Sequence, residues 1–193
     1  MSGMTNHEIT TFLGTLQDQV AGESLAKLSA ISTSISLSKG TTLMEEGSTH
    51  DYFYILVKGS AKAYHWNDGE AVCNWFAFEN DVLTTIGAYD GGASNETIEL
   101  LEDVKLIQIN TNEFNHLSKH NLNIGRLSFH WFSEYTKFLS QRVDLQSLPS
   151  LDRYEKITKA HPELLQRVSL TDLASYLGMR QETLSRVRAK VRF

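Results

Sequence analysis

The side chains best suited to chemistry in this sequence lie near its C-terminus, over residues 170–189. Ala174 stands where two packed helices would touch, and Gly178 follows where a tight turn needs a residue that tolerates positive φ. Ser169, three residues before Asp172, predicts a side-chain cap at the start of the first helix. Apolar residues occupy the offsets that a small core requires: Leu173, Leu177, Met179, Leu184 and Val187. The segment therefore predicts a helix-turn-helix.

The second helix of this motif carries polar side chains that could contact DNA. In a helix-turn-helix the second helix enters the major groove with its N-terminal turns. Four outward residues are predicted to read base edges: Gln181, Glu182, Ser185 and Arg186. Three basic residues farther along are predicted to contact phosphates: Arg188, Lys190 and Arg192. Arg180 precedes the helix where Ser or Thr would cap better. The alternative interpretation is a helical hairpin with a solvated basic face.

The distribution of charge favours a separate basic module at the C-terminus. The chain has 193 residues and a formal net charge of −5. Residues 1–150 carry 9 basic and 18 acidic groups, whereas residues 151–193 carry 9 basic and 5 acidic groups. Such asymmetry is typical of a small nucleic-acid-binding module joined to a larger acidic domain, although chance scatter remains an alternative.

Composition excludes several classes of protein. With 41% apolar and 21% charged residues, the chain is typical of a globular protein. The single cysteine, Cys73, cannot form an internal disulfide or a cysteine-based cluster, and it fits a reducing compartment. Neither a secretory signal nor a transmembrane helix is expected, so we predict a cytoplasmic protein that makes no membrane contact.

Two patterns precede the basic module. Residues 12–31 have helical spacing, and residues 35–109 contain short runs rich in β-branched and aromatic residues. Turn pairs such as Lys39-Gly40 separate these runs, which predicts a β-sandwich or barrel. Asp68-Gly69 is suited to a two-residue hairpin turn. The expected strands are 35–37, 41–44, 52–57, 61–66, 72–78, 97–101 and 104–109.

A long helix is expected between the two domains, because the helical period returns after residue 110 and stops at Ser147-Leu148-Pro149-Ser150. One apolar face is interrupted only by Arg142; it consists of Ile124, Leu127, Trp131, Tyr135, Phe138 and Leu145. A second face contains Phe129, Phe132 and Leu139. We expect one face to pack on the β-domain and the other on the same helix of a second copy. A single buried helix within a monomer is the alternative.

Together these residues resemble the Crp/Fnr family of bacterial transcription regulators. Residues 182–186 match the Glu-x-x-Ser-Arg pattern of Fnr-like members, and residues 39–59 and 98–103 resemble the family's cyclic-nucleotide-binding domain. The resemblance implies an α+β fold: a cyclic-nucleotide-binding-like jelly roll at 1–116, a dimerisation helix at 117–147 and a winged helix-turn-helix at 150–193. The chain stops soon after the second helix of the motif, so we expect the wing to be short or missing.

The same resemblance implies a function without catalysis. The protein is expected to bind an inverted-repeat site on double-stranded DNA as a homodimer, with RNA polymerase as a candidate partner. Glu182, Ser185 and Arg186 are the base readers that the family pattern implies. No catalytic residue and no metal site are predicted.

The family's ligand motif is where this chain departs. That motif has a Gly-Glu pair for the ribose and a later Arg for the cyclic phosphate, but Thr84 and Thr85 stand at the pair and Ser94 stands near the Arg. No Lys or Arg lies between Lys62 and Lys105, and a buried phosphate without a cation loses its charge-assisted hydrogen bonds. We therefore predict no cofactor, with cAMP or cGMP binding absent or weak. An unknown effector could occupy a pocket lined by Thr84, Thr85, Ser94 and Thr97; a filled barrel core is the alternative.

Two other functions are alternatives to a regulator. A cupin-like metal enzyme would need clustered ligands, and His116 and His120 are one helical turn apart without an evident third ligand. A haem ligand is not expected at His65, which is better interpreted as a satisfied strand residue. A dimeric ligand-binding scaffold that has lost DNA binding is the other rival, and the intact base readers argue against it.

Overall fold

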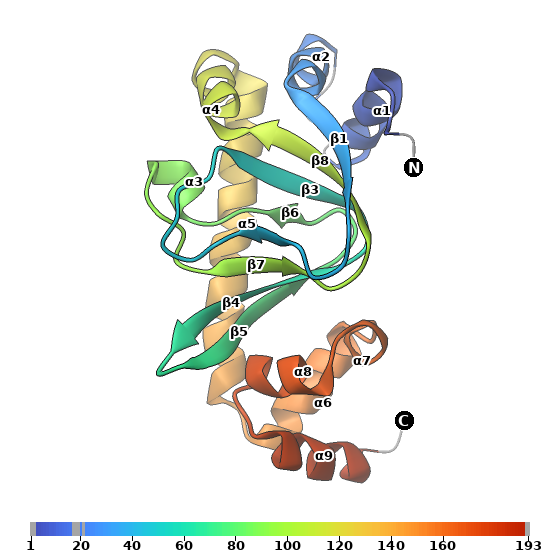
Figure 1. The fold of residues 1–193 in the computed structure, drawn as a ribbon, viewed down its shortest axis with the longest axis vertical. Coiled ribbons are helices and arrows are strands. Elements are labelled where there is room, and N and C mark those ends of the chain that lie inside the picture. The colour runs from blue at the N-terminus through green and yellow to red at the C-terminus, as the bar shows by residue number, and fades with distance from the viewer. Residues whose placement is uncertain (1–2, 17–19, 21, 192–193) are drawn as a thin grey trace.

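The computed structural model describes residues 3–16, 20 and 22–191, and it contains a β-domain, a long helix and a helical C-terminal unit (Figure 1). The chain begins with two helices, α1 (Asn6–Leu16) and α2 (Glu23–Ala30). The helical pattern of residues 12–31 is thus divided between two helices. Gly22, with a φ of 58°, stands immediately before α2, outside the right-handed helical region.

Two four-stranded antiparallel sheets form the β-domain, with strand orders β1-β8-β3-β6 and β2-β7-β4-β5. This arrangement confirms the predicted sandwich. Ile55, Leu106 and Ile98 are fully buried in its core. The strands are β1 (Ser32–Leu37), β2 (Thr42–Met44), β3 (Tyr52–Lys58), β4 (Ala61–Asn67), β5 (Glu70–Ala77), β6 (Val82–Leu83), β7 (Thr97–Leu100) and β8 (Val104–Asn110).

Local turn chemistry explains the hairpin between β4 and β5. Asp68 and Gly69 both have positive φ, 50° and 83°, as a two-residue turn of the primed type requires. The predicted turn is confirmed. The sequence pattern missed β6, which has only two residues, and the short helix α3 (Gly87–Asp90) that follows it.

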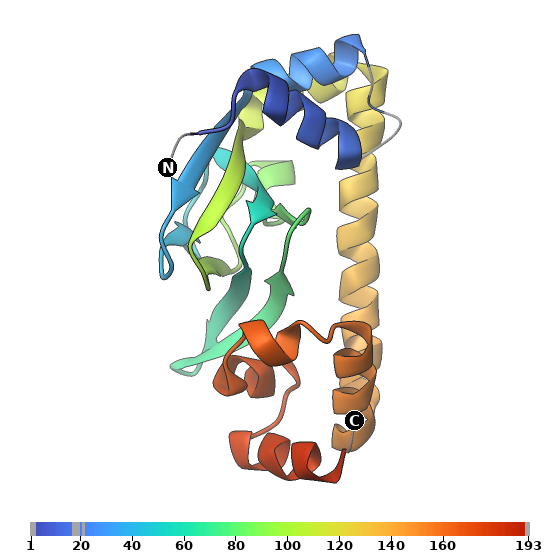
Figure 2. The same ribbon diagram turned by 90° about the vertical axis from the view of Figure 1, so that its right-hand side faces the viewer.

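The long helix α5 (Leu122–Ser147) follows helix α4 (Thr111–His120) and runs along the β-domain to the C-terminal unit (Figure 2). It begins at Leu122 rather than at residue 117, because the Asn121 side chain accepts hydrogen bonds from the first-turn amides of Asn123 and Ile124. One face packs on the β-domain, where the Trp131 ring contacts Phe53 and Phe114 at centroid distances of 5.9 and 5.6 Å. The face predicted to pair with a second copy is solvent-exposed: Phe129 is 72% exposed.

The C-terminal unit consists of α6 (Ser150–Ala160), α7 (Leu164–Arg167), α8 (Leu170–Tyr176) and α9 (Gln181–Lys190). Its own hydrophobic core includes Tyr154, Leu173, Leu177 and Leu184. All regular elements between residues 150 and 191 are helices, so this described part of the unit has no wing hairpin. Across the described residues, no helix is both long and apolar enough to cross a bilayer.

Candidate nucleic-acid interface

The turn between α8 and α9 has the geometry that its residues predicted. Gly178 has a φ of 61°, and Ala174 and Leu177 are buried between the helices. The amide of Met179 donates to the carbonyl of Ala174 at 3.0 Å, which closes the turn. The Ser169 hydroxyl accepts from the amide of Asp172 at 3.0 Å, so the predicted cap is confirmed. These local contacts hold α9 at a fixed angle to α8.

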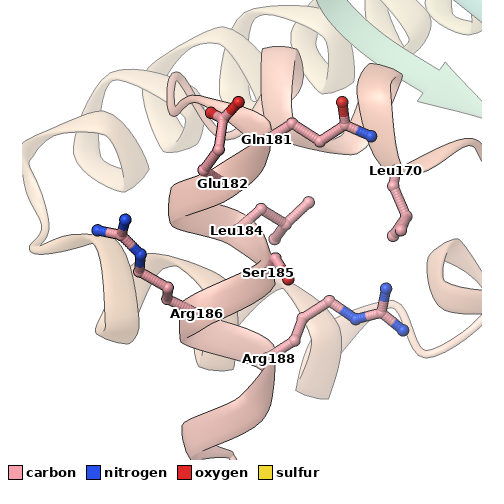
Figure 3. Close-up of a pocket in the computed structure, with 7 residues that line it drawn as sticks. All are labelled: Leu170, Gln181, Glu182, Leu184, Ser185, Arg186 and Arg188. Carbon is pink, nitrogen blue, oxygen red and sulfur yellow. The ribbon is translucent and has the colours of Figure 1, made fainter.

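The surface of α9 forms a depression of about 470 Å³ (Figure 3). In Figure 3, Glu182 and Arg186 extend from one side of the helix, and Gln181 and Arg188 extend from the other. The depression is lined by Leu170, Gln181, Glu182, Leu184, Ser185, Arg186 and Arg188. The structure thus brings the four predicted base readers together with one predicted phosphate contact.

The other two predicted phosphate contacts lie outside this depression. Lys190 is exposed in the last turn of α9 and does not line it. Arg192 lies outside the described residues. Arg180 is the residue before α9, and its side chain makes no capping hydrogen bond, as expected from its type.

The face of α9 that carries the four predicted base readers is free to make new contacts. Within the described part of the chain, the side chains of Gln181, Glu182, Ser185 and Arg186 form no hydrogen bond or ion pair, and all four residues are exposed. Polar side chains that are already solvated and unpaired can bind base edges without first breaking protein contacts.

Two other arginines of the basic module have structural roles instead. Arg153 donates to the carbonyls of Leu177, Gln146 and Leu148, the last two at 2.9 Å, and so ties the end of α5 to the helix-turn-helix. Arg167 pairs with Glu79 at 2.7 Å and with Glu102 at 2.8 Å. The net positive charge of the module therefore overstates the charge available to a nucleic acid.

Leu170 is a candidate contact that the sequence reasoning missed. It lies at the first position of α8, lines the depression beside α9 and is 41% exposed. An exposed apolar side chain at this place can contact the methyl group of thymine or a sugar. Its spacing from Leu173 and Leu177 is that of a core residue, so periodicity alone gives no sign of its exposure.

Polar contacts fix the C-terminal unit against the β-domain. Lys62 on β4 pairs with Asp172 on α8 at 2.8 Å, and the amide of Cys73 on β5 donates to the Ser175 hydroxyl at 2.9 Å. From α5, Arg142 donates to the carbonyl of Cys73 at 2.8 Å and to that of Tyr176 at 3.2 Å. The β-domain, the long helix and the helix-turn-helix thus meet at one junction.

The four residues predicted to line an effector pocket are all buried. The Ser94 hydroxyl donates to the carbonyl of Glu96. The Thr97 hydroxyl accepts from the amide of Glu46 at 3.1 Å. Thr84 lines a groove between the β-domain and α5. A pocket shared by Thr84, Thr85, Ser94 and Thr97 stays a prediction.

A buried carboxyl group lies two residues beyond Ser94. Glu96 is 2% exposed, and its oxygens accept from Trp75 Nε1 at 2.9 Å and from Asn74 Nδ2 at 2.8 Å. Burial raises the pKa of Glu96 above its ordinary value, and the two hydrogen bonds oppose that rise. Whatever its protonation state, this group offers no positive charge to an anion.

The histidines considered as metal or haem ligands and the single cysteine have the following surroundings. The rings of His116 and His120 have centroids 4.6 Å apart, and the described residues hold no cluster of three or more His, Cys, Asp or Glu suited to a metal ion. His65 Nδ1 contacts Asn74 Oδ1 at 2.9 Å, as a strand histidine would. Burial raises the pKa of Cys73 to about 12, so the thiol is un-ionised at neutral pH.

Known proteins share part of this sequence pattern and the overall fold. Residues 34–121 match the family model of the cyclic nucleotide-binding domain. No curated protein sequence matches the chain. Among solved structures, FixK2 from Bradyrhizobium japonicum is similar with a TM-score of 0.70 and 19% identity, over 83% of this chain and 84% of that one.

Two further structures share the fold at similar coverage. CLP of Xanthomonas campestris, described as a c-di-GMP-responsive global regulator, gives a TM-score of 0.64 at 17% identity over 83% of this chain and 86% of its own. The catabolite activator protein of Thermus thermophilus gives 0.56 at 14% identity over 90% and 85%. Residues 34–121 are therefore similar to the cyclic nucleotide-binding domain, and the chain shares its fold with FixK2, CLP and the catabolite activator protein.

Proposed function

We propose that the protein is a DNA-binding transcription regulator that recognises an inverted-repeat site as a homodimer. The observation that carries this proposal is the exposed, unpaired set of polar side chains on α9, held by a capped and tightly turned helix-turn-helix. The fold shared with known regulators supports it.

The homodimer is proposed from the exposed face of α5. Phe129, Phe132, Leu139 and Val143 are all large, apolar and at least 38% exposed. Pairing two such helices would bury this stripe and place two readers on one face of the duplex. Two half-sites would then lie about 34 Å apart, one helical turn of DNA.

We also propose that cAMP and cGMP bind weakly or not at all. The support is chemical: a carboxyl group, Glu96, is buried beside the loop where a nucleotide phosphate would need a cation, and no Lys or Arg lies between residues 62 and 105. Calorimetric titration with cAMP is expected to show no saturable heat at micromolar concentrations. A clear isotherm would disprove this part of the proposal.

Selection of bound sequences from a random pool of duplexes tests the main proposal. The expected result is enrichment of an inverted repeat, for which Arg186→Ala lowers discrimination against scrambled duplex by about 1–3 kcal/mol. Lys159→Ala is the matched control, because Lys159 is an exposed cation on α6 that does not line the depression on α9. If no sequence is enriched, the chain is a scaffold without DNA recognition.

A further inference from the structure

A groove of about 960 Å³ lies where the β-domain, α5 and the C-terminal unit meet. It is lined by Trp75 and Phe78 from the β-domain, Trp131 and Tyr135 from α5, and Ile157 and Tyr176 from the C-terminal unit. Its volume lies at the upper end of the range typical of small-molecule sites, about 300–1,000 Å³.

The lining of this groove is rich in aromatic and acidic side chains. Eight of its 23 lining residues are aromatic. Four more are acidic, Glu79, Asp81, Glu134 and Glu163, whereas none of the described lining residues is Lys or Arg. An anionic ligand would therefore find repulsion, while a ligand with positive charge would find both carboxylates and aromatic faces.

Three of the four carboxylates already have partners. Glu134 pairs with Lys137 at 2.6 Å, and Glu163 contacts His161 at 3.1 Å. Arg167, whose guanidinium lies 4.9 Å from the Phe78 ring centroid, is shared between Glu79 and Glu102, so one cation serves two carboxylates.

Asp81 is the exception. Its carboxylate accepts a hydrogen bond from the amide of Phe78 at 2.8 Å, and within the described residues it has no ion-pair partner. Burial raises the pKa of Asp81 above its ordinary value, and the negative charges of Glu79 and Glu163 raise it further, while the Phe78 amide and His161 oppose the rise.

We propose that this groove binds an organic cation, an amine or quaternary ammonium on an apolar or aromatic body, with its charge near Asp81 and its body against the aromatic side chains. Cations are attracted to the faces of Trp, Tyr and Phe, and the attraction grows as the site excludes water. Because the groove touches all three parts of the molecule, such a ligand would favour one orientation of the reader relative to α5. Only this regulatory consequence rests on the proposed function; binding itself does not.

Three probes of similar size and different charge test the proposal: benzyltrimethylammonium, N,N-dimethylbenzamide and benzenesulfonate. Tryptophan fluorescence is a direct readout, because Trp75 and Trp131 line the groove. The exposed Trp66 lies outside it and is removed by Trp66→Phe as a common background. We expect saturable quenching by the cation, with about threefold to thirtyfold tighter binding than the amide, and no saturation with the sulfonate.

A matched pair of substitutions locates the charge. Asp81→Asn keeps an acceptor for the Phe78 amide and is expected to weaken cation binding about twofold to fivefold. Asp68→Asn makes the same change on the exposed β4–β5 turn and should have no effect. Thermal unfolding of both variants checks that the fold is retained. Tyr135→Leu gives a second test if Asp81→Asn unfolds: it is expected to weaken binding of the cationic probe and to leave binding of the amide almost unchanged.

Several results would overturn the inference. They are equal or tighter binding of the sulfonate, absence of saturation by all three probes, or cation binding that neither Asp81→Asn nor Tyr135→Leu changes. Cation binding that disappears as protein concentration rises would assign the groove to a second copy of the chain. Duplex binding is measured separately, so loss of probe binding with intact sequence-specific DNA binding refutes this inference alone, and the reverse refutes only the proposed function.

Discussion

Replacing Arg142 with methionine tests whether one side chain couples the β-domain, the long helix and the helix-turn-helix. The guanidinium donates to the carbonyls of Cys73 and Tyr176 and lies 4.6 Å from the Tyr176 ring centroid. A hydrogen bond from a charged donor contributes about 1.5–3 kcal/mol when it is well buried. Arg142 is half-buried and loses side-chain entropy on ordering, so we expect a loss of about 2–3 kcal/mol for the pair of bonds.

Arg126 provides the matched control. It lies on the same helix, is exposed and forms no hydrogen bond or ion pair within the described residues. Arg126→Met should therefore change the free energy of unfolding by less than about 0.5 kcal/mol. The loss of stability in Arg142→Lys should lie between those of Arg142→Met and Arg126→Met, because a single ammonium group cannot reproduce the planar guanidinium that reaches two carbonyls.

Two measurements compare the stability and the local opening of these variants. Urea unfolding gives the loss of stability, and hydrogen exchange compares the amides of β5 and α8 with those of the sheet core. We expect Arg142→Met to accelerate exchange selectively at 70–77 and 170–176, where the junction loosens. If Arg142→Met and Arg126→Met unfold at the same urea concentration and exchange alike, Arg142 does not couple the three parts.

Three further predictions concern the helix-turn-helix and the contacts that hold the C-terminal unit against the β-domain. Gly178→Ala is expected to destabilise the protein by about 1–2 kcal/mol, because the left-handed φ of 61° disfavours any side chain; an unchanged melting temperature would contradict this. Ser169→Ala should cost about 1 kcal/mol through loss of the hydrogen bond to the Asp172 amide, and Ser169→Thr should restore most of it in the same melting assay. Hydrogen bonds from Arg167 lower the pKa of Glu79 from 4.5 to about 2, so the stability that this carboxylate contributes is present above pH 4.5 and lost as the pH falls towards 2. The free energy of unfolding should therefore fall less between pH 4.5 and pH 2 in Arg167→Met than in the original protein. Identical pH profiles of the two proteins would refute the coupling between Arg167 and Glu79.

The helix-turn-helix could be predicted from sequence because its determinants are local. The cap at Ser169, the small residue Ala174 and the positive φ of Gly178 act within about a dozen residues of one another, and all three have the expected geometry. The strands were predictable for a related reason, since alternating burial and glycine-containing turns leave a signal within each hairpin. Short elements such as β6 leave too few residues for a pattern.

The roles of the charged residues depended on contacts between distant parts of the chain. Arg142 interrupts an apolar face of α5 for no local reason, and only folding brings it to carbonyls that lie 69 and 34 residues away. Arg153 and Arg167 count toward the basic charge of the module, yet both are bound to other parts of the protein.

Sequence alone predicted the β-sandwich, the long helix and the helix-turn-helix with its polar second helix, because local propensity and periodicity are properties of short segments. Tertiary structure decided which cations stay free for a partner, why Leu170 is exposed and where a groove whose described lining residues include no Lys or Arg lies between the β-domain and α5. These features arise from side chains far apart in the chain, whose proximity is set by how the sheets, the long helix and the reader pack together.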